Sequence, residues 1–508
     1  MKRNPSLKVN ILANYTSQLY VTGLGILILP LYIKYMGGEA YGLVGFFAML
    51  QAWFNLLDLG LTPTLARETA RYHGGDASAL SFRRLLRSLS VIFVISAFIG
   101  GGGLWFFADT IALSWLNVKT LEIEEVIFAI QIMAVAVAMR WVSGIYRGII
   151  TGSERLAWLS AFNACIASLK FLGVFLSMSL FGYTPSVFFL HQLAIAAIEL
   201  IILYAMGERI APDKKLIKEP IGWSIRPVRS VLKFSLTIAF TSSVWVFVTQ
   251  SDKLVLSGIL GLKEYGFFTL SVLAASSILI LSGPISQSIM PRMSRLYAEK
   301  SLEEMLRVYR DGTKLVVIIA GSAAFVLAFF SKDILLIWTG DELLSEHASK
   351  ILTLYSIGNL FLILSAFPYY LQYAKGKLRY HLYSNIVMIV LLIPLIIFFA
   401  REYGAIGAGW VWMTINAFFL FFWATFIHYK LSPSIAKKWL FKDVLALLIP
   451  EFCIVILLSN YFDLSAYDGV YKLAYIVFSF LVVVLVALLI NIKTRVFLFN
   501  KFRGLLYS

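Results

Sequence analysis

The sequence predicts an all-α integral membrane protein of about fourteen transmembrane helices, arranged as two parallel-repeat six-helix lobes around a central cavity plus two additional C-terminal helices. Three observations lead to this fold class. Long apolar runs recur along the chain, basic residues gather in alternate connecting segments, and the sequence resembles itself at one offset. With 60% hydrophobic and only 14% charged residues among 508, the composition lies far outside the range usual for soluble proteins.

The apolar runs set the number and position of the predicted helices. A bilayer core about 30 Å thick requires roughly 20 apolar residues per helix. Runs of that kind predict helices at 10–33, 41–61, 89–108, 125–146, 157–181, 185–206, 233–258, 264–290, 313–333, 349–373, 381–400, 404–428, 443–462 and 470–490.

The basic residues predict the orientation of the chain. With the N-terminus placed inside, 35 of the 44 Lys and Arg residues fall in inner segments and seven in outer ones, whereas acidic residues divide 11 to 13. The positive-inside rule requires an asymmetry specific to Lys and Arg. Both termini are therefore predicted to be cytoplasmic, and the net charge of +16 is explained by topology rather than by binding to nucleic acid.

An internal repeat predicts two related halves. The segment YMGGEAYG at 35–42 aligns with ILGLKEYG at 259–266 at an offset of 224, and matches in 146–160 recur in 370–384 at the same offset. An even number of spans per repeat preserves orientation, so the lobes are expected to be parallel copies with a cavity between them.

These signals give the expected organisation of the chain. It comprises an N-lobe with the first six helices at 1–206, a cytoplasmic basic linker at 207–232, a C-lobe with helices seven to twelve at 233–428, a hairpin of the last two helices at 429–490 and a cytoplasmic tail at 491–508.

Several segments resemble those of a known family. LPLYIKYMGGEAYGLVGFF and the following FNLLDLGLTPTLARETARY, QSDKLVLSGILGLKEYGFFTLS at 250–271 and REYGAIGAGW at 401–410 resemble polysaccharide and O-antigen flippases of the Wzx type. These belong to the multidrug/oligosaccharidyl-lipid/polysaccharide (MOP) exporter superfamily, which also holds drug extruders and lipid II flippases. The resemblance covers nearly the whole chain, including the last two helices, which drug extruders usually lack.

The resemblance implies a flippase of the bacterial inner membrane that works by alternating access. Its expected substrate is an undecaprenyl-diphosphate-linked oligosaccharide, moved from the cytoplasmic to the periplasmic leaflet for surface polysaccharide synthesis. Its other expected partners are membrane lipid and the polysaccharide polymerase machinery. No cofactor is expected. No GxxxxGK[ST] phosphate loop is present, so an H⁺ or Na⁺ gradient is the expected energy source.

Two alternatives remain open at this point. One is a cation-coupled small-molecule or drug exporter of the same superfamily. The other is a membrane polymerase or glycosyltransferase that handles lipid-linked sugars, although the outer loops at 109–124 and 334–348 are short and no enzyme constellation is visible, so the protein is not expected to be an enzyme.

Ionisable residues inside spans are candidates for substrate contact because a charge in a bilayer is costly. Fixed cations there replace the hydration of a lipid diphosphate. The cavity cations predicted from sequence are Lys170, Arg140, Arg147 and Lys253. Arg140 and Arg147 share a helical face, while Lys170 has an alternative structural role as a partner of Glu199 and Arg147 has one as an interfacial anchor.

Other polar residues are candidates for gating, ion coupling or contact with sugar. The gating or ion-coupling candidates are Asp58, Arg67, Asp252, Glu199 and Glu451, and the polar candidates for the lumen are Asn14, Gln18, Thr241 and Gln250. An ion pair of Asp58 with Arg67 and a helix-packing role for the polar residues are the structural alternatives. Because Asp252 and Lys253 are adjacent, they are expected to point about 100° apart on a helix.

Overall fold

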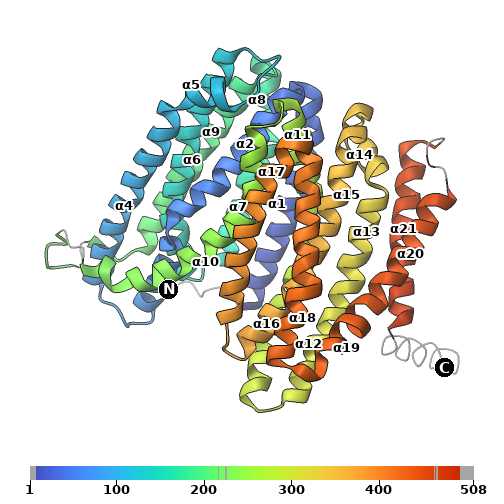
Figure 1. The fold of residues 1–508 in the computed structure, drawn as a ribbon. Coiled ribbons are helices and arrows are strands. Elements are labelled where there is room, and N and C mark those ends of the chain that lie inside the picture. The colour runs from blue at the N-terminus through green and yellow to red at the C-terminus, as the bar shows by residue number, and fades with distance from the viewer. Residues whose placement is uncertain (1–6, 215–216, 223–225, 463, 465–466, 492–508) are drawn as a thin grey trace, which may run out of the picture. The chain divides into compact units, whose positions relative to one another are not determined.

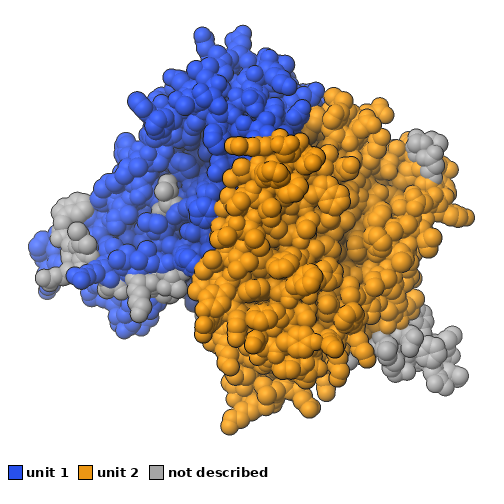
Figure 2. Space-filling model, in the orientation of Figure 1, with its two compact units in different colours: residues 1–266 blue, residues 267–508 orange. Residues whose placement is uncertain are grey.

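The computed structural model describes residues 7–214, 217–222, 226–462, 464 and 467–491. All elements in this part of the chain are helical (Figure 1). By internal contacts the chain divides into unit 1, Met1–Gly266, and unit 2, Phe267–Ser508 (Figure 2). The tail predicted at 491–508 lies outside the described residues apart from Asn491.

Unit 1 holds twelve helical elements and the start of a thirteenth. They are α1 (Leu7–Met36), α2 (Gly38–Phe54), η1 (Asn55–Asp58), α3 (Leu61–His73), α4 (Ala79–Phe106), α5 (Ala108–Thr110), η2 (Ile111–Trp115), α6 (Ile123–Gly152), α7 (Leu156–Phe171), α8 (Gly173–Phe181), α9 (Pro185–Ile210), α10 (Arg226–Ser257) and the first residues of α11 (Leu262–Ala298).

Unit 2 continues from α11 to the end of the chain. Its elements are α12 (Leu302–Val316), η4 (Val317–Gly321), α13 (Ser322–Phe329), α14 (Ser331–Thr339), α15 (Glu342–Ser365), α16 (Phe367–Ala374), α17 (Arg379–Phe418), η5 (Phe419–Trp423), α18 (Ala424–Leu431), η6 (Pro433–Ile435), α19 (Ala436–Lys438), η7 (Trp439–Leu445), α20 (Ala446–Tyr461) and α21 (Gly469–Ile490).

Within the described residues, ten helices are long and apolar enough to cross a membrane. One of these ranges, 379–431, contains two of the spans predicted from sequence, 381–400 and 404–428. They are separated at Gly404, where φ is 58° and ψ is −142°, so the helical path breaks there. The all-helical membrane fold is confirmed, and the number fourteen stays a prediction.

Local breaks correct two of the predicted spans. The helix predicted at 41–61 ends at Phe54, because Leu59 and Gly60 both have positive φ and α3 starts afresh at Leu61. The helix predicted at 313–333 is interrupted by the π-helical turn η4 and ends at Phe329. Hydropathy alone does not detect such breaks, since the residues that form them are largely apolar.

The centre of unit 1 is α6, which packs on α3, α4 and α9, while α1 packs on α7 (Figure 1). One apolar cluster in unit 1 includes Leu65, Leu89, Ile145 and Ile149, all fully buried. In unit 2, α15 packs on α13, α14 and α17. These bundles hold the polar side chains described next in fixed positions.

Candidate functional site

Four helices of unit 1 bring a group of charged and amide side chains together within their long apolar stretches. We call this group the cationic cluster. It comprises Gln51 of α2, Arg140 and Arg147 of α6, Lys170 of α7, and Gln192 and Glu199 of α9. The helices α2, α7 and α9 each pack on α6, so the scaffold is continuous around the cluster.

Two hydrogen bonds of the same kind join α6 to α9. Arg140 and Arg147 are seven residues apart, and so are Gln192 and Glu199. Seven residues make about two helical turns, or roughly 10.5 Å, and return a side chain to nearly the same face. Arg140 donates to Gln192 Oε1 at 3.2 Å, and Arg147 donates to Glu199 Oε1 at 2.5 Å. The parallel packing of α6 on α9 therefore produces the same Arg-to-acceptor contact twice.

Arg140 is held on several sides. Its guanidinium donates to Gln51 Oε1 at 2.8 Å and lies 3.9 Å from Glu199, and it stands over the ring of Phe47 at 5.5 Å. Its side chain is only 13% exposed, against 29% for Arg147. Arg140 is therefore the more enclosed of the two arginines, and Arg147 has the larger accessible surface for a ligand.

Lys170 lies beside these two contacts and, within the described part of the chain, forms no ion pair. Gln192 Nε2 donates to the backbone oxygen of Lys170 at 3.1 Å, and the ammonium lies 5.2 Å from the ring centre of Phe171. The charges of Arg140 and Glu199 both act on it. Among the described residues, however, no carboxylate lies within 4 Å of its nitrogen, and Glu199 pairs with the two arginines instead.

The balance of charge in the cluster is positive. Three basic side chains face one carboxylate, so basic groups exceed acidic groups by two. Guanidinium groups present several N–H donors in a planar fork that matches phosphate oxygens. The cluster therefore has the chemistry of a site for a doubly charged anion, and no combination of nucleophile and base is present within it.

The acidic residue predicted at the end of the second span is hydrogen-bonded to the first turn of the next helix, α3. Asp58 accepts from the backbone N–H of Thr62 at 3.2 Å and from its hydroxyl at 2.5 Å, which fixes the first turn of α3. Its recorded partner in the described chain is Thr62 alone, so the structure does not contain the alternative ion pair with Arg67. Arg67 lies on the exposed side of α3, 4.0 Å from Glu68.

Asp252 and Lys253 of α10 approach each other more closely than expected. The ammonium of Lys253 is 3.9 Å from Asp252 Oδ1 and donates to the oxygen of Thr249 at 2.7 Å. The flexible lysine stem folds back along the helix, which the angle between adjacent positions does not take into account. On the same helix Gln250 donates to Thr249 at 3.4 Å, and the side chain of Thr241 lies outside the described residues.

The remaining sequence candidates are dispersed. Asn14 and Gln18 are exposed on α1, and neither belongs to the cationic cluster. Glu451 of α20 belongs to unit 2 and is fully buried, and neither of its carboxyl oxygens has a hydrogen-bond partner in the described part of the chain. It lies against Gly321, at the end of the π-helical turn η4.

Sequence reasoning missed the neutral and inter-helical members of the polar network. Gln51 and Gln192 carry no charge, yet they complete the environment of Arg140. The seven-residue spacing of Gln192 and Glu199, equal to that of the two arginines, was a usable signal. In unit 2, Asp443 is buried between Arg310 at 2.5 Å and Lys314 at 3.2 Å, a contact between segments far apart in sequence.

Comparison with known proteins identifies the family. The family model described as "Polysaccharide biosynthesis protein" matches residues 7–297, which is more than half of the chain, and the MatE family model matches 237–398. A Shigella flexneri protein named "Putative O-antigen transporter" is 21% identical over 381 residues, covering 74% of this chain and 87% of that protein.

Solved structures share the fold. The lipid II flippase MurJ in an inward closed conformation is similar with a TM-score of 0.72, 14% identity and coverage of 96% of this chain and 99% of that one. An inward-facing multidrug resistance MATE family transporter of the MOP superfamily gives a TM-score of 0.63 at 14% identity, covering 84% and 99%. With its many membrane-length helices, the chain is a multi-pass membrane transporter that belongs to the polysaccharide biosynthesis protein family within the MOP superfamily.

Proposed function

We propose that the protein is a flippase that carries an undecaprenyl-diphosphate-linked oligosaccharide from the cytoplasmic to the periplasmic leaflet of the bacterial inner membrane, for surface polysaccharide synthesis. The observation that carries the proposal is the cationic cluster of unit 1, in which three basic side chains on membrane-length helices face one carboxylate. The name of the Shigella flexneri relative and the family description agree with a polysaccharide precursor as substrate.

The charge of the cluster suits the head group of such a lipid. A diphosphate esterified at both ends carries two negative charges, equal to the excess of the cluster. Moving it away from water is costly, since even one charged side chain at the bilayer centre costs ~2.5–3.5 kcal/mol on insertion scales. Arg147 and Lys170 supply donors that replace the lost hydration, while Arg140 and Glu199 hold them in place.

In this proposal transport needs no covalent step. The carrier binds the head group from the cytoplasmic side, changes conformation and releases it outside, and an H⁺ or Na⁺ gradient or removal of product outside drives the cycle. Both termini lie in the cytoplasm, and the polymerase machinery takes up the product in the periplasm.

The test is export in a strain that lacks the gene. Lys170→Ala and Arg147→Gln are expected to reduce surface polysaccharide at least tenfold and to leave lipid-linked repeat units in the inner leaflet. Lys170→Arg is expected to retain part of the activity. Lys332→Gln, on α14 of unit 2, is the matched control for loss of one positive charge. Wild-type export by well-inserted Lys170→Ala and Arg147→Gln variants would remove the cluster from the transport path.

The drug exporter remains the second candidate, since the MatE family model matches 237–398. It predicts that loss of the protein raises sensitivity to cationic drugs without accumulation of lipid-linked sugar. The excess of cations in the cluster disfavours it, because like charges repel a cationic drug.

A further inference from the structure

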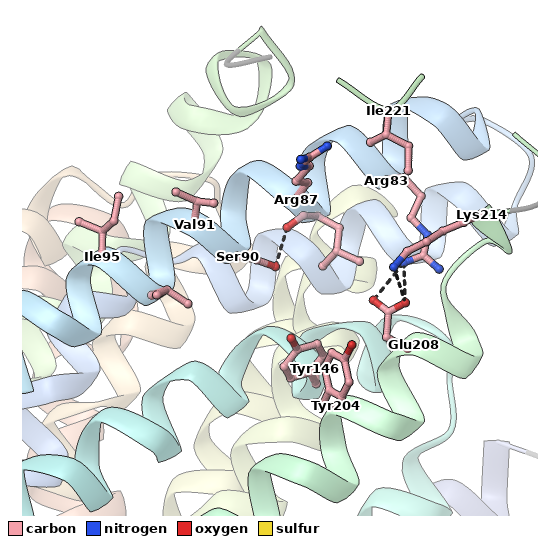
Figure 3. Close-up of a pocket in the computed structure, with 12 residues that line it drawn as sticks. Arg83, Arg87, Ser90, Val91, Ile95, Tyr146, Tyr204, Glu208, Lys214 and Ile221 are labelled. Carbon is pink, nitrogen blue, oxygen red and sulfur yellow. Dashed lines mark hydrogen bonds and ion pairs between the residues drawn. The ribbon is translucent and has the colours of Figure 1, made fainter. Parts of the chain in front are cut away.

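Unit 1 contains a pocket that is separate from the cationic cluster (Figure 3). It has a volume of about 620 Å³, within the roughly 300–1,000 Å³ usual for ligand sites. Its walls come from α4, α6, α9 and the segment that follows α9, and no member of the cationic cluster lines it.

One face of α4 changes from basic to apolar along this pocket. The lining residues of α4 follow helical spacing over about 18 Å, so they share one side of the helix. In order they are Arg83, Leu86, Arg87, Ser90, Val91, Val94 and Ile95. Val94 and Ile95 are 42% and 52% exposed, so the apolar end of the pocket opens to the surface of the molecule.

The basic end of the pocket is held together by the hydrogen bonds and ion pairs of its basic side chains. Arg83 is buried, donates from Nε to the backbone oxygen of Pro212 at 2.7 Å, and donates from Nη1 to both carboxylate oxygens of Glu208 at 2.9 and 3.0 Å. Lys214 lies 3.6 Å from the same carboxylate (Figure 3). Arg87 lines the same end, so three of the residues that line it are basic and one, Glu208, is acidic.

Two tyrosines stand between the charged and apolar ends. The rings of Tyr146 and Tyr204 meet edge to face at 5.3 Å (Figure 3). Tyrosine side chains are typical of the boundary between head groups and acyl chains, because one end of the ring is apolar and the other polar. The pocket is therefore basic at one end, aromatic in the middle and apolar at the other end. A phospholipid has its phosphate, head-group boundary and acyl chain in the same order.

We propose that this pocket binds an anionic phospholipid of the cytoplasmic leaflet, with the phosphate at Arg87 and Lys214 and one acyl chain along Val91, Val94 and Ile95. Basic pockets between transmembrane helices on the cytoplasmic side are suited to such head groups. The lipid stabilises the docking of the segment after α9 on α4, since Lys214 belongs to that segment and Arg87 to the helix.

The experiment compares lipids on the purified, delipidated full-length protein in a non-ionic detergent. Phosphatidylglycerol is expected to raise the Tm by several degrees, whereas phosphatidylcholine with the same chains and sn-glycerol 3-phosphate at equal concentration are not. An equal shift with phosphatidylcholine would show that charge is irrelevant, and an equal shift with glycerol phosphate would show a site for a free anion. Either result overturns the proposal.

Paired variants assign the effect to the pocket. The double variant Arg87→Gln/Lys214→Gln is expected to lose most of the increase in Tm that phosphatidylglycerol causes. It is also expected to lose the bound lipid that native mass spectrometry detects. Arg209→Gln/Lys218→Gln removes the same charge from exposed positions that do not line the pocket and is expected to keep both. A full shift in the first pair, or an equal loss in the second, contradicts the proposal.

A second substitution tests the apolar end and does not depend on the charged variants folding. Val94→Trp fills that end while leaving the cations in place, so it is expected to reduce the shift. Ile99→Trp, on the exposed face of the same helix outside the pocket, is its control and is expected to preserve it. Retention of the full shift by Val94→Trp would exclude an acyl chain at this place.

Discussion

At the scale of single residues, Glu199 is the one carboxylate among the described residues that contacts the arginines of the cationic cluster. It lies 2.5 Å from Arg147 and 3.9 Å from Arg140, and its charge also acts on Lys170. Cations held close together in a medium of low dielectric repel one another strongly. We therefore assign Glu199 a structural role. Its negative charge reduces the repulsion among the cations of the cluster when no ligand is bound.

This role can be measured in a double-mutant cycle. Glu199→Gln is expected to destabilise the protein by roughly 1–3 kcal/mol, because it leaves three cations without a counter-charge. Adding Arg147→Gln is expected to recover part of that loss, since one positive charge is removed as well. The measurement is the Tm in detergent, with the exposed Glu303→Gln as baseline. Losses that simply add in the double variant would mean that the two side chains are not coupled.

Glu39, just before the predicted second span, has a pKa that is shifted by its hydrogen bonds. It accepts the backbone N–H groups of Lys119, Thr120 and Leu121 at 2.7–2.9 Å, as well as the hydroxyl of Thr120. Burial alone would raise the pKa of this carboxyl, but the hydrogen bonds outweigh burial and hold the pKa below its ordinary value of 4.5.

The sign of the pH dependence follows from this lowered pKa. The contribution of Glu39 to stability is complete above the ordinary pKa and is lost as the pH falls through the lower value of the folded protein. The difference in Tm between wild type and Glu39→Gln is therefore expected to be constant from pH 8 to about pH 5 and to shrink below it. A difference that grows on acidification would contradict the assignment.

At the scale of elements, the first turns of α2 and α11 lie against each other in unit 1. A Cβ on Gly42 would overlap the backbone oxygen of Leu262, and one on Gly266 would come within 3.0 Å of the oxygen of Gly38. Gly42 and Gly266 are the positions that align in the internal repeat. The repeated YG motif therefore has a physical reason, which is the close approach of two backbones.

Alanine substitutions at these glycines are expected to lower the Tm more where the facing backbone lies closer. Gly42→Ala is expected to lower the Tm most because a backbone oxygen cannot move aside, and Gly266→Ala should have a smaller effect since shifts of a few tenths of an ångström suffice. Gly23→Ala on α1 is the control, because nothing lies within 4 Å of its Cβ and alanine favours a helix by up to about 1 kcal/mol. Equal effects at Gly42 and Gly23 would contradict the close approach.

The positions of the helices were largely predictable from sequence, and the breaks within them were not. Hydropathy locates each apolar run, but the turn after Phe54 and the π-helical turn η4 lie within such runs and do not interrupt them. The same limit applies to the cationic cluster. The cations were visible as costly charges in spans, and the spacing of Gln192 from Glu199 was a further signal, whereas Gln51 became recognisable only through the packing of α6 on α2.

At the scale of the whole molecule, the distribution of basic residues still makes a prediction that the fold alone does not test. Lys and Arg are counted 35 to seven between the two sides assigned from sequence, and a membrane protein inserts with the richer side in the cytoplasm. The chain therefore has a definite expected sidedness at every loop, and each loop can be tested independently of transport.

Single cysteines in a chain whose two native cysteines, Cys165 and Cys453, are replaced by alanine measure this sidedness. Cysteine at Gly75, Lys300 or Gly376 is expected to react with a membrane-impermeant maleimide only after the membrane is permeabilised. Cysteine at Gly182, Gly340 or Tyr467 is expected to react in intact spheroplasts, because these positions follow an odd number of the predicted spans. Labelling of Gly75 and Gly340 from the same side would require a different number of crossings between them, and would remove the parallel orientation of the two repeats on which alternating access depends.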